Sequence, residues 1–116
     1  MMIRDKGVFR GERVLPADWL EHMVDVKDSD RNAMNLNPNY SQADWIAYQD
    51  MWWILDETTE EFCAVGIHGQ VIYINRSTDT VMVWFSSQRD AASTLAPEFP
   101  VKLSAARAAA NFLAEQ

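Results

Sequence analysis

The sequence has few of the residues that would place it quickly in a functional class. It contains one cysteine, Cys63, and this excludes an intramolecular disulfide and a cysteine-based zinc site. Ten Lys and Arg residues against 17 Asp and Glu residues give a net charge of −7. This balance argues against nucleic acid or an anionic membrane as a partner, because binding to phosphates needs positive charge. No apolar run has the length of a membrane span and no signal-peptide core is visible, so we expect a cytoplasmic chain.

The common motifs of nucleophilic enzymes are also absent. There is no Gly-x-Ser-x-Gly, and no serine stands three residues before a lysine. Tyr73-Ile74-Asn75 has the Tyr-x-Asn form found in serine acyltransferases, but it falls within a predicted strand, and we interpret it as ordinary strand sequence. Cys63 has no basic neighbour in sequence to activate it, so we expect a small buried apolar side chain.

The two histidines have different surroundings in the sequence. His22 falls on the polar side of a predicted helix and is expected to be solvated. His68 lies between Gly66 and Gly69, and two glycines in four residues indicate a tight bend or a close backbone approach. Two interpretations remain open: a hairpin turn, or a strand edge whose backbone N–H groups face a ligand. No second ligand stands at a usable spacing, so we expect no metal and no cofactor.

Hydrophobic patterning predicts an α+β fold. The first 15 residues are predicted to be a loop or tail, and residues 27–41 a long polar loop. Apolar spacing predicts a short helix over about residues 16–26 and a C-terminal helix with an apolar stripe of Leu103, Ala106, Ala110 and Leu113. Strand-like segments occur at 51–56, 62–66, 70–75 and 80–86, followed by a predicted loop at 91–100. We therefore expect an antiparallel sheet of three to four strands with the C-terminal helix packed on it.

Five tryptophans in 116 residues is a high count, and their rings need a core, a pocket or a partner to cover them. Trp52 and Trp53 are adjacent in a predicted strand, so their rings should face opposite sides of the sheet. We expect one ring to enter the core and the other to line a groove.

An ordered series of short motifs resembles the C-terminal part of serine hydrolases related to class C β-lactamases. It is most similar to the branch with esterases and 6-aminohexanoate-dimer hydrolases. The segment 7–19 is similar to the family's G-x-x-x-G-x-R-[IV]-L-P-x-x-W loop and helix, and 48–53 to its Y-G-x-x-W-W strand. The segment 62–74 is similar to its F-x-A-x-G-x-x-G-Q-x-I-x-[IV] hairpin. The resemblance covers roughly residues 6–116 and implies part of a β-lactamase/transpeptidase-like fold.

The resemblance also implies roles for individual residues. Ala64-Val65-Gly66 stands where β-lactamases carry Lys-Thr-Gly, so the backbone N–H of Ile67 is implied as an oxyanion-hole donor. Gly66 and His68 are implied to border the substrate, and Trp53, rather than Trp52, to form a wall of the acyl pocket. Without the Lys and Thr side chains, a small ester or amide fits better than a β-lactam.

The family's nucleophilic serine, its lysine three residues later and its tyrosine have no counterpart here. The resemblance therefore implies that residues 1–116 are a single partial domain, the C-terminal portion of an enzyme, and are inactive alone. Such a fragment is expected to pair with the missing lobe or with a second copy of itself. The alternative is a free-standing acidic α+β module that binds a basic protein, as inhibitors and immunity proteins do.

Overall fold

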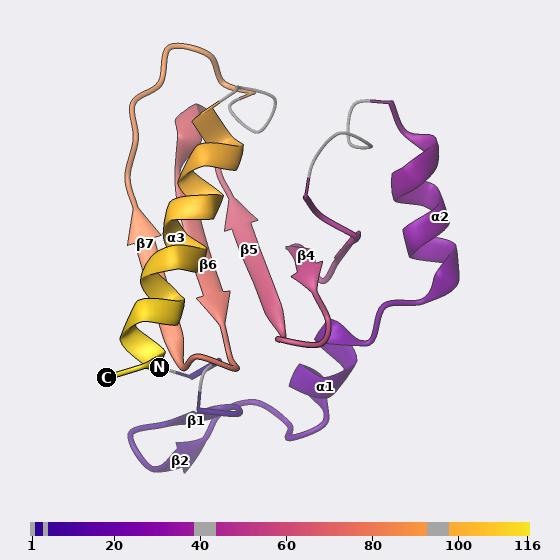
Figure 1. Ribbon diagram of the computed structural model, residues 1–116. Helices are drawn as coiled ribbons and strands as arrows, with labels where there is room; N and C mark the ends of the chain where they lie inside the picture. Colours follow the sequence, from indigo (N-terminus) through magenta and orange to yellow (C-terminus); the bar gives the residue numbers. More distant parts are fainter. Residues whose placement is uncertain (1, 4, 39–43, 93–97) are drawn as a thin grey trace.

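The computed structural model describes residues 2–3, 5–38, 44–92 and 98–116, and its fold is α+β as predicted (Figure 1). A five-stranded antiparallel sheet has the strand order β3-β4-β5-β6-β7, which is sequence order. Its strands are β3 (Ala47–Gln49), β4 (Trp52–Asp56), β5 (Glu61–Val65), β6 (Val71–Asn75) and β7 (Thr80–Trp84). Four of them lie where the sequence predicts strands. The three-residue β3 was not predicted, so the sheet has one strand more than expected.

The turns between these strands follow from side chains that bond their own backbone. The Asp56 carboxylate accepts hydrogen bonds from the backbone N–H groups of Thr58 and Thr59 at 2.7 and 3.2 Å. The Asn75 side-chain oxygen accepts one from the Thr78 N–H at 3.1 Å. Such local bonds favour turns over continued strand, so they fix where β4 and β6 end.

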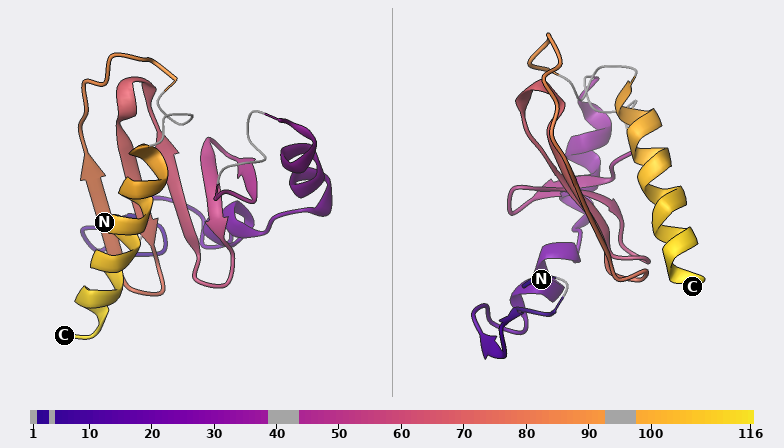
Figure 2. Two further views of the ribbon diagram at one scale, coloured as in Figure 1. Left: turned by 45° about the horizontal axis from the view of Figure 1, so that its top comes forward. Right: turned by 90° about the vertical axis from the view of Figure 1, so that its left-hand side faces the viewer.

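Helix α3 (Glu98–Ala114) covers one side of the sheet, here called the α3 face (Figure 2). Its residues Leu103, Ala106 and Ala110 are buried in one cluster with Cys63 and Tyr73 of the sheet. The predicted apolar stripe is wrong at its last member, because Leu113 is 58% exposed. Residues 111–116 are all exposed, so the buried side of α3 ends at Ala110. The helix also begins earlier than expected: Glu98, Phe99 and Pro100 belong to it, and residues 93–97 of the predicted loop lie outside the described residues.

The opposite side of the sheet, the α1 face, is only partly covered, since Ile72, Val83 and Phe85 are exposed. Helix α1 (Trp19–Val24) buries Leu20 and Met23 against a cluster that includes Ile54, Phe62 and Ile74. The Gln49 side-chain amide donates hydrogen bonds to the backbone oxygens of His22 and Met23, which satisfies carbonyls in the last turn of this helix.

The sequence interpretation was wrong for much of residues 27–41, because Asp28–Leu36 form helix α2 rather than a loop. Asp28 and Asp30 stand in its first turn, where negative charge interacts favourably with the helix dipole. Met34 is its one buried residue, and most of the helix consists of Asp, Ser and Asn, residue types that favour turns and loops. Arg31 forms an ion pair with Glu57, which ties α2 to the turn between β4 and β5. Residues 39–41 of the predicted loop lie outside the described residues.

The N-terminal segment, predicted to be a loop or tail, contains a small hairpin of β1 (Val8–Phe9) and β2 (Glu12–Arg13). Its two-residue turn is Arg10-Gly11, and both residues have positive φ (51° and 85°). This conformation suits a tight hairpin and is easy for glycine. None of the helices formed by the described residues is long and apolar enough to cross a membrane.

Candidate active-site turn and groove

The turn between β5 and β6 carries three of the predicted site residues. It is a short 3₁₀ turn, Ile67–Gly69, which the Gly66 N–H closes by donating to the Gln70 carbonyl at 2.8 Å. Of the two interpretations of the Gly66–Gly69 segment, the hairpin turn is therefore correct for the backbone path. The close approach predicted from the glycines belongs to Gly69, with φ of +82°, and not to Gly66, with φ of −97°.

Ile67 is the most exposed residue of the Ile67–Gly69 turn. Its side chain is 65% exposed. Among the residues that the structure describes, no oxygen accepts a hydrogen bond from its backbone N–H. An N–H without an acceptor among the described residues, on an exposed residue in the turn after a central strand, can donate to a bound oxygen atom.

His68 is turned toward its own chain rather than outward. Its ring Nδ1 lies 2.9 Å from the Gln88 carbonyl oxygen, and its backbone N–H donates to the Ala91 carbonyl at 3.2 Å. A carbonyl can only accept, so Nδ1 carries the proton in this contact. The other histidine, His22, is exposed on α1 and takes no part in this region.

A groove of about 530 Å³ lies beside the turn, and Gly66, the residue before Ile67, lines it. The groove is mostly apolar, and no charged side chain of the described residues borders it. Its other lining residues include Tyr48, Met51, Trp52, Ile72, Val83 and Phe85. A volume in this range with few polar groups is typical of a site for a small organic molecule.

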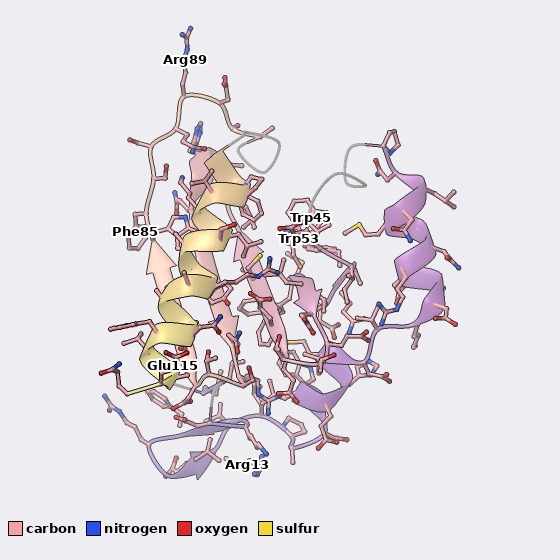
Figure 3. The ribbon with its side chains drawn as sticks, in the orientation of Figure 1. Arg13, Trp45, Trp53, Phe85, Arg89 and Glu115 are labelled. Carbon is pink, nitrogen blue, oxygen red and sulfur yellow. The ribbon has the colours of Figure 1, made fainter. Side chains whose placement is uncertain are left out.

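The two adjacent tryptophans face opposite sides of the sheet as predicted, and both border the groove. Trp53 lies on the α3 face, with its ring 4.4 Å from the rings of Trp45 and Tyr48 (Figure 3). Trp52 lies on the α1 face and meets Phe62 edge-on at 5.3 Å. Both are half-buried, so each ring contributes to the core and to the groove at once.

The Tyr-x-Asn segment has a structural role on the α3 face, as its interpretation as strand sequence predicted. The Tyr73 hydroxyl donates to the buried Glu61 carboxylate at 2.6 Å, and the Arg107 guanidinium of α3 donates to both oxygens of that carboxylate at 2.8 to 3.1 Å. Burial and the carboxylate next to it raise the pKa of Tyr73 well above its ordinary value. A tyrosine held neutral in this way is not a general base.

Cys63 lies in the same cluster and is fully buried, as predicted. Burial, with a smaller effect of Glu61, raises the pKa of its thiol from 9.0 to about 12. The thiolate is the nucleophilic form, so Cys63 is inert at neutral pH. Within the described part of the chain, no three His, Cys, Asp or Glu side chains come together as a set of metal ligands.

Comparison with known proteins finds similarity to a hydrolase. Over 89 residues, which are 77% of this chain, the sequence is 32% identical to a 6-aminohexanoate-dimer hydrolase from Paenarthrobacter ureafaciens. The chain is homologous to part of that hydrolase. The matched region is 22% of the hydrolase's length, so the chain spans about a fifth of the curated relative. No protein-family model matches the chain.

Several residues of this region were not recognised in the sequence. Gln88 contacts His68 and Gly69, and Tyr48, Met51 and Phe85 line the groove. Figure 3 shows Phe85 at the end of β7, where the chain continues toward Arg89. Phe85 is 86% exposed. A large apolar side chain this exposed marks a surface that another segment or molecule covers, and its place near the end of the predicted strand 80–86 was the signal in the sequence.

Proposed function

We propose that this chain is the C-terminal part of a β-lactamase-related serine hydrolase that cleaves an ester or amide bond through an acyl-enzyme. The observation that carries the proposal is the backbone N–H of the exposed residue Ile67. It has no acceptor among the described residues, and the preceding residue, Gly66, lines an apolar groove. The homology to part of a 6-aminohexanoate-dimer hydrolase supports it.

The chemistry assigned to this chain is stabilisation of charge. The serine oxygen of the remaining part attacks the substrate carbonyl carbon, and the electron pair of the C=O bond moves onto the carbonyl oxygen. The Ile67 N–H donates a hydrogen bond to that oxygen and so stabilises the tetrahedral intermediate. Collapse of the intermediate expels the alcohol or amine, and water then releases the acid from the serine. The chain holds no serine three residues before a lysine, so the nucleophile and its base come from outside it.

The groove is proposed to hold the acyl part of the substrate. Trp53 is proposed as the aromatic wall and Gly66 adjoins the donor, while the His68 ring binds the Gln88 carbonyl. None of the described residues that line the groove is charged. An uncharged acyl group of the substrate is therefore favoured over one that carries a carboxylate at this position. The partner of this chain is the lobe that carries the nucleophile, and it is expected to cover the exposed apolar part of the α1 face.

The first experiment measures hydrolysis of a chromogenic short-chain ester. It compares the chain alone with the chain mixed with a polypeptide that corresponds to the upstream two-thirds of such a hydrolase. We expect activity in the mixture and none from the chain alone. Absence of activity in both, with a monomeric folded chain, contradicts the hydrolase proposal and favours the acidic binding module.

The donor itself is tested by Ile67→Pro, which removes the N–H. Ile67 is the first residue of the 3₁₀ turn, and Gly66 before it has an extended ψ of 164°, so proline fits this backbone. Loss of one oxyanion donor is expected to lower kcat of the mixture by about 100-fold or more. Ile67→Ala keeps the N–H and measures the side chain alone. Equal losses in the two variants would contradict a backbone donor.

A further inference from the structure

The chain segment after β7 is bound to the turn that carries Ile67. Three hydrogen bonds connect them, all through His68. The His68 N–H donates to Ala91 O at 3.2 Å, the Gln88 N–H donates to His68 O at 3.1 Å, and the His68 Nδ1–H donates to Gln88 O at 2.9 Å. The ring of His68 adds a third hydrogen bond to the two backbone bonds, so this residue is held at three points.

The backbone of His68 adopts an uncommon conformation that these bonds help to hold. Its φ and ψ are 60° and 22°, a left-handed conformation that non-glycine residues rarely adopt. Such a conformation persists where surrounding contacts hold it. Asn, Asp and His adopt it more often than other side chains, and a plain aliphatic residue is among those that avoid it.

The next residue shows how closely the two segments approach. A Cβ on Gly69 would lie 2.7 Å from Gln88 Oε1 and 3.0 Å from Ser86 Oγ. Gln88 Oε1 is buried and has no donor among the described residues. The segment around Gln88 therefore packs directly on the turn, and the turn cannot rotate without breaking that contact.

We propose that His68 is a positioning residue: by binding Gln88 and Ala91 it fixes the orientation of the Ile67 N–H. This inference rests on the proposed function for its catalytic meaning. The Ile67 N–H belongs to the peptide unit between Gly66 and Ile67, and Ile67 alone separates that unit from the residue that is held at three points. When these hydrogen bonds are lost, the turn relaxes from its left-handed conformation and the Ile67 N–H no longer keeps one orientation.

The test uses four variants that separate the backbone from the ring. His68→Ala loses the ring bond and strains the left-handed backbone. His68→Gly relieves the strain and still lacks the bond. His68→Asn tolerates the conformation, and its amide places an N–H donor close to the position of Nδ1. His22→Ala, at the exposed histidine of α1, is the matched control.

The first readout needs no activity: backbone amide relaxation and hydrogen exchange of the ¹⁵N-labelled chain. We expect increased motion at Ile67 and Gly69 in His68→Ala and His68→Gly, and wild-type behaviour in His68→Asn and His22→Ala. An unchanged Ile67 amide in both His68→Ala and His68→Gly overturns the proposal.

The second readout is steady-state hydrolysis by the mixture described above. We expect kcat to fall about 10- to 100-fold in His68→Ala and His68→Gly with little change in KM, and to recover in His68→Asn. An effect on KM alone would mean that His68 contacts substrate, and it would refute a positioning role. If the wild-type mixture is inactive, the proposed function fails, while the amide measurement still decides whether His68 holds the turn.

Discussion

The contact between Glu61 and Arg107 is the interaction whose removal should destabilise this protein most. The Glu61 carboxylate is 3% exposed and accepts hydrogen bonds from the Tyr73 hydroxyl and from two nitrogens of Arg107. Arg107→Leu leaves that carboxylate buried with one donor in place of four contacts. Breaking a buried ion pair on one side costs about 3 to 5 kcal/mol. We place the expected loss near 3 kcal/mol, because the Arg107 side chain is 34% exposed and part of the pair is screened by water.

The converse change gives the sharper comparison. Glu61→Leu leaves the Arg107 guanidinium able to reach water and to keep its 3.4 Å contact with Asp44, so its cost should be smaller, about 2 kcal/mol. The double variant with leucine at both positions removes the unpaired charge and should be more stable than Arg107→Leu alone.

The assay is urea denaturation, monitored by circular dichroism, of the wild type, the two single variants and the double variant. Their free energies of unfolding are combined in a double-mutant cycle. A double variant that is less stable than Arg107→Leu, or single losses that simply add, would show that the pair does not act as a unit. In that case α3 is held to the sheet by its apolar stripe alone.

Three further predictions concern other parts of the chain. Cys63 and Tyr73 both have pKa values above their ordinary ones, so the unfolded state loses these protons first. The contribution of the two groups to stability should be constant below about pH 9 and then fall by up to about 1.4 kcal/mol per pH unit per group, with a shallower fall in Cys63→Ala. Native Cys63 should resist thiol reagents at pH 8 and react fully in urea, and fast reaction of the folded chain would contradict its burial. In a urea titration, Gly69→Ala should lower the free energy of unfolding by about 2 kcal/mol and Gly11→Ala by about 1 kcal/mol. Both glycines have positive φ, but a Cβ at Gly11 meets nothing within 4 Å, whereas one at Gly69 meets Gln88. Equal losses would show that the Gln88 side chain simply moves aside.

The strands were predictable because each carries its own signal. The segments at β4 to β7 are rich in β-branched and aromatic residues and are separated by turns that Asp56 and Asn75 stabilise locally. Helix α2 was missed because Asp, Ser and Asn make up most of it, and these residue types favour turns and loops. Strand β3 was missed because three residues are too short for an alternation to be seen.

The candidate site divides in the same way. The turn at Gly66 to Gly69 and the opposed faces of the two tryptophans follow from neighbouring residues, so the sequence indicates them. The hold on His68 comes from Gln88, 20 residues later, and Arg107 reaches Glu61 across 46 residues. Nothing local in the sequence encodes such pairs, and their partners become visible only when the strands are placed side by side.

The distance along the chain between Glu61 and Arg107 also has a consequence for biosynthesis. The carboxylate leaves the ribosome 46 residues before the guanidinium that neutralises it. The sheet can pair its strands as they emerge, but its α3 face should stay hydrated until α3 follows, because an unpaired carboxylate resists burial. Ribosome-stalled chains that end before Arg107 should therefore hold a formed sheet with an open face, accessible to chaperones and proteases. Release of the last helix would then be the step that commits the domain to its final packing.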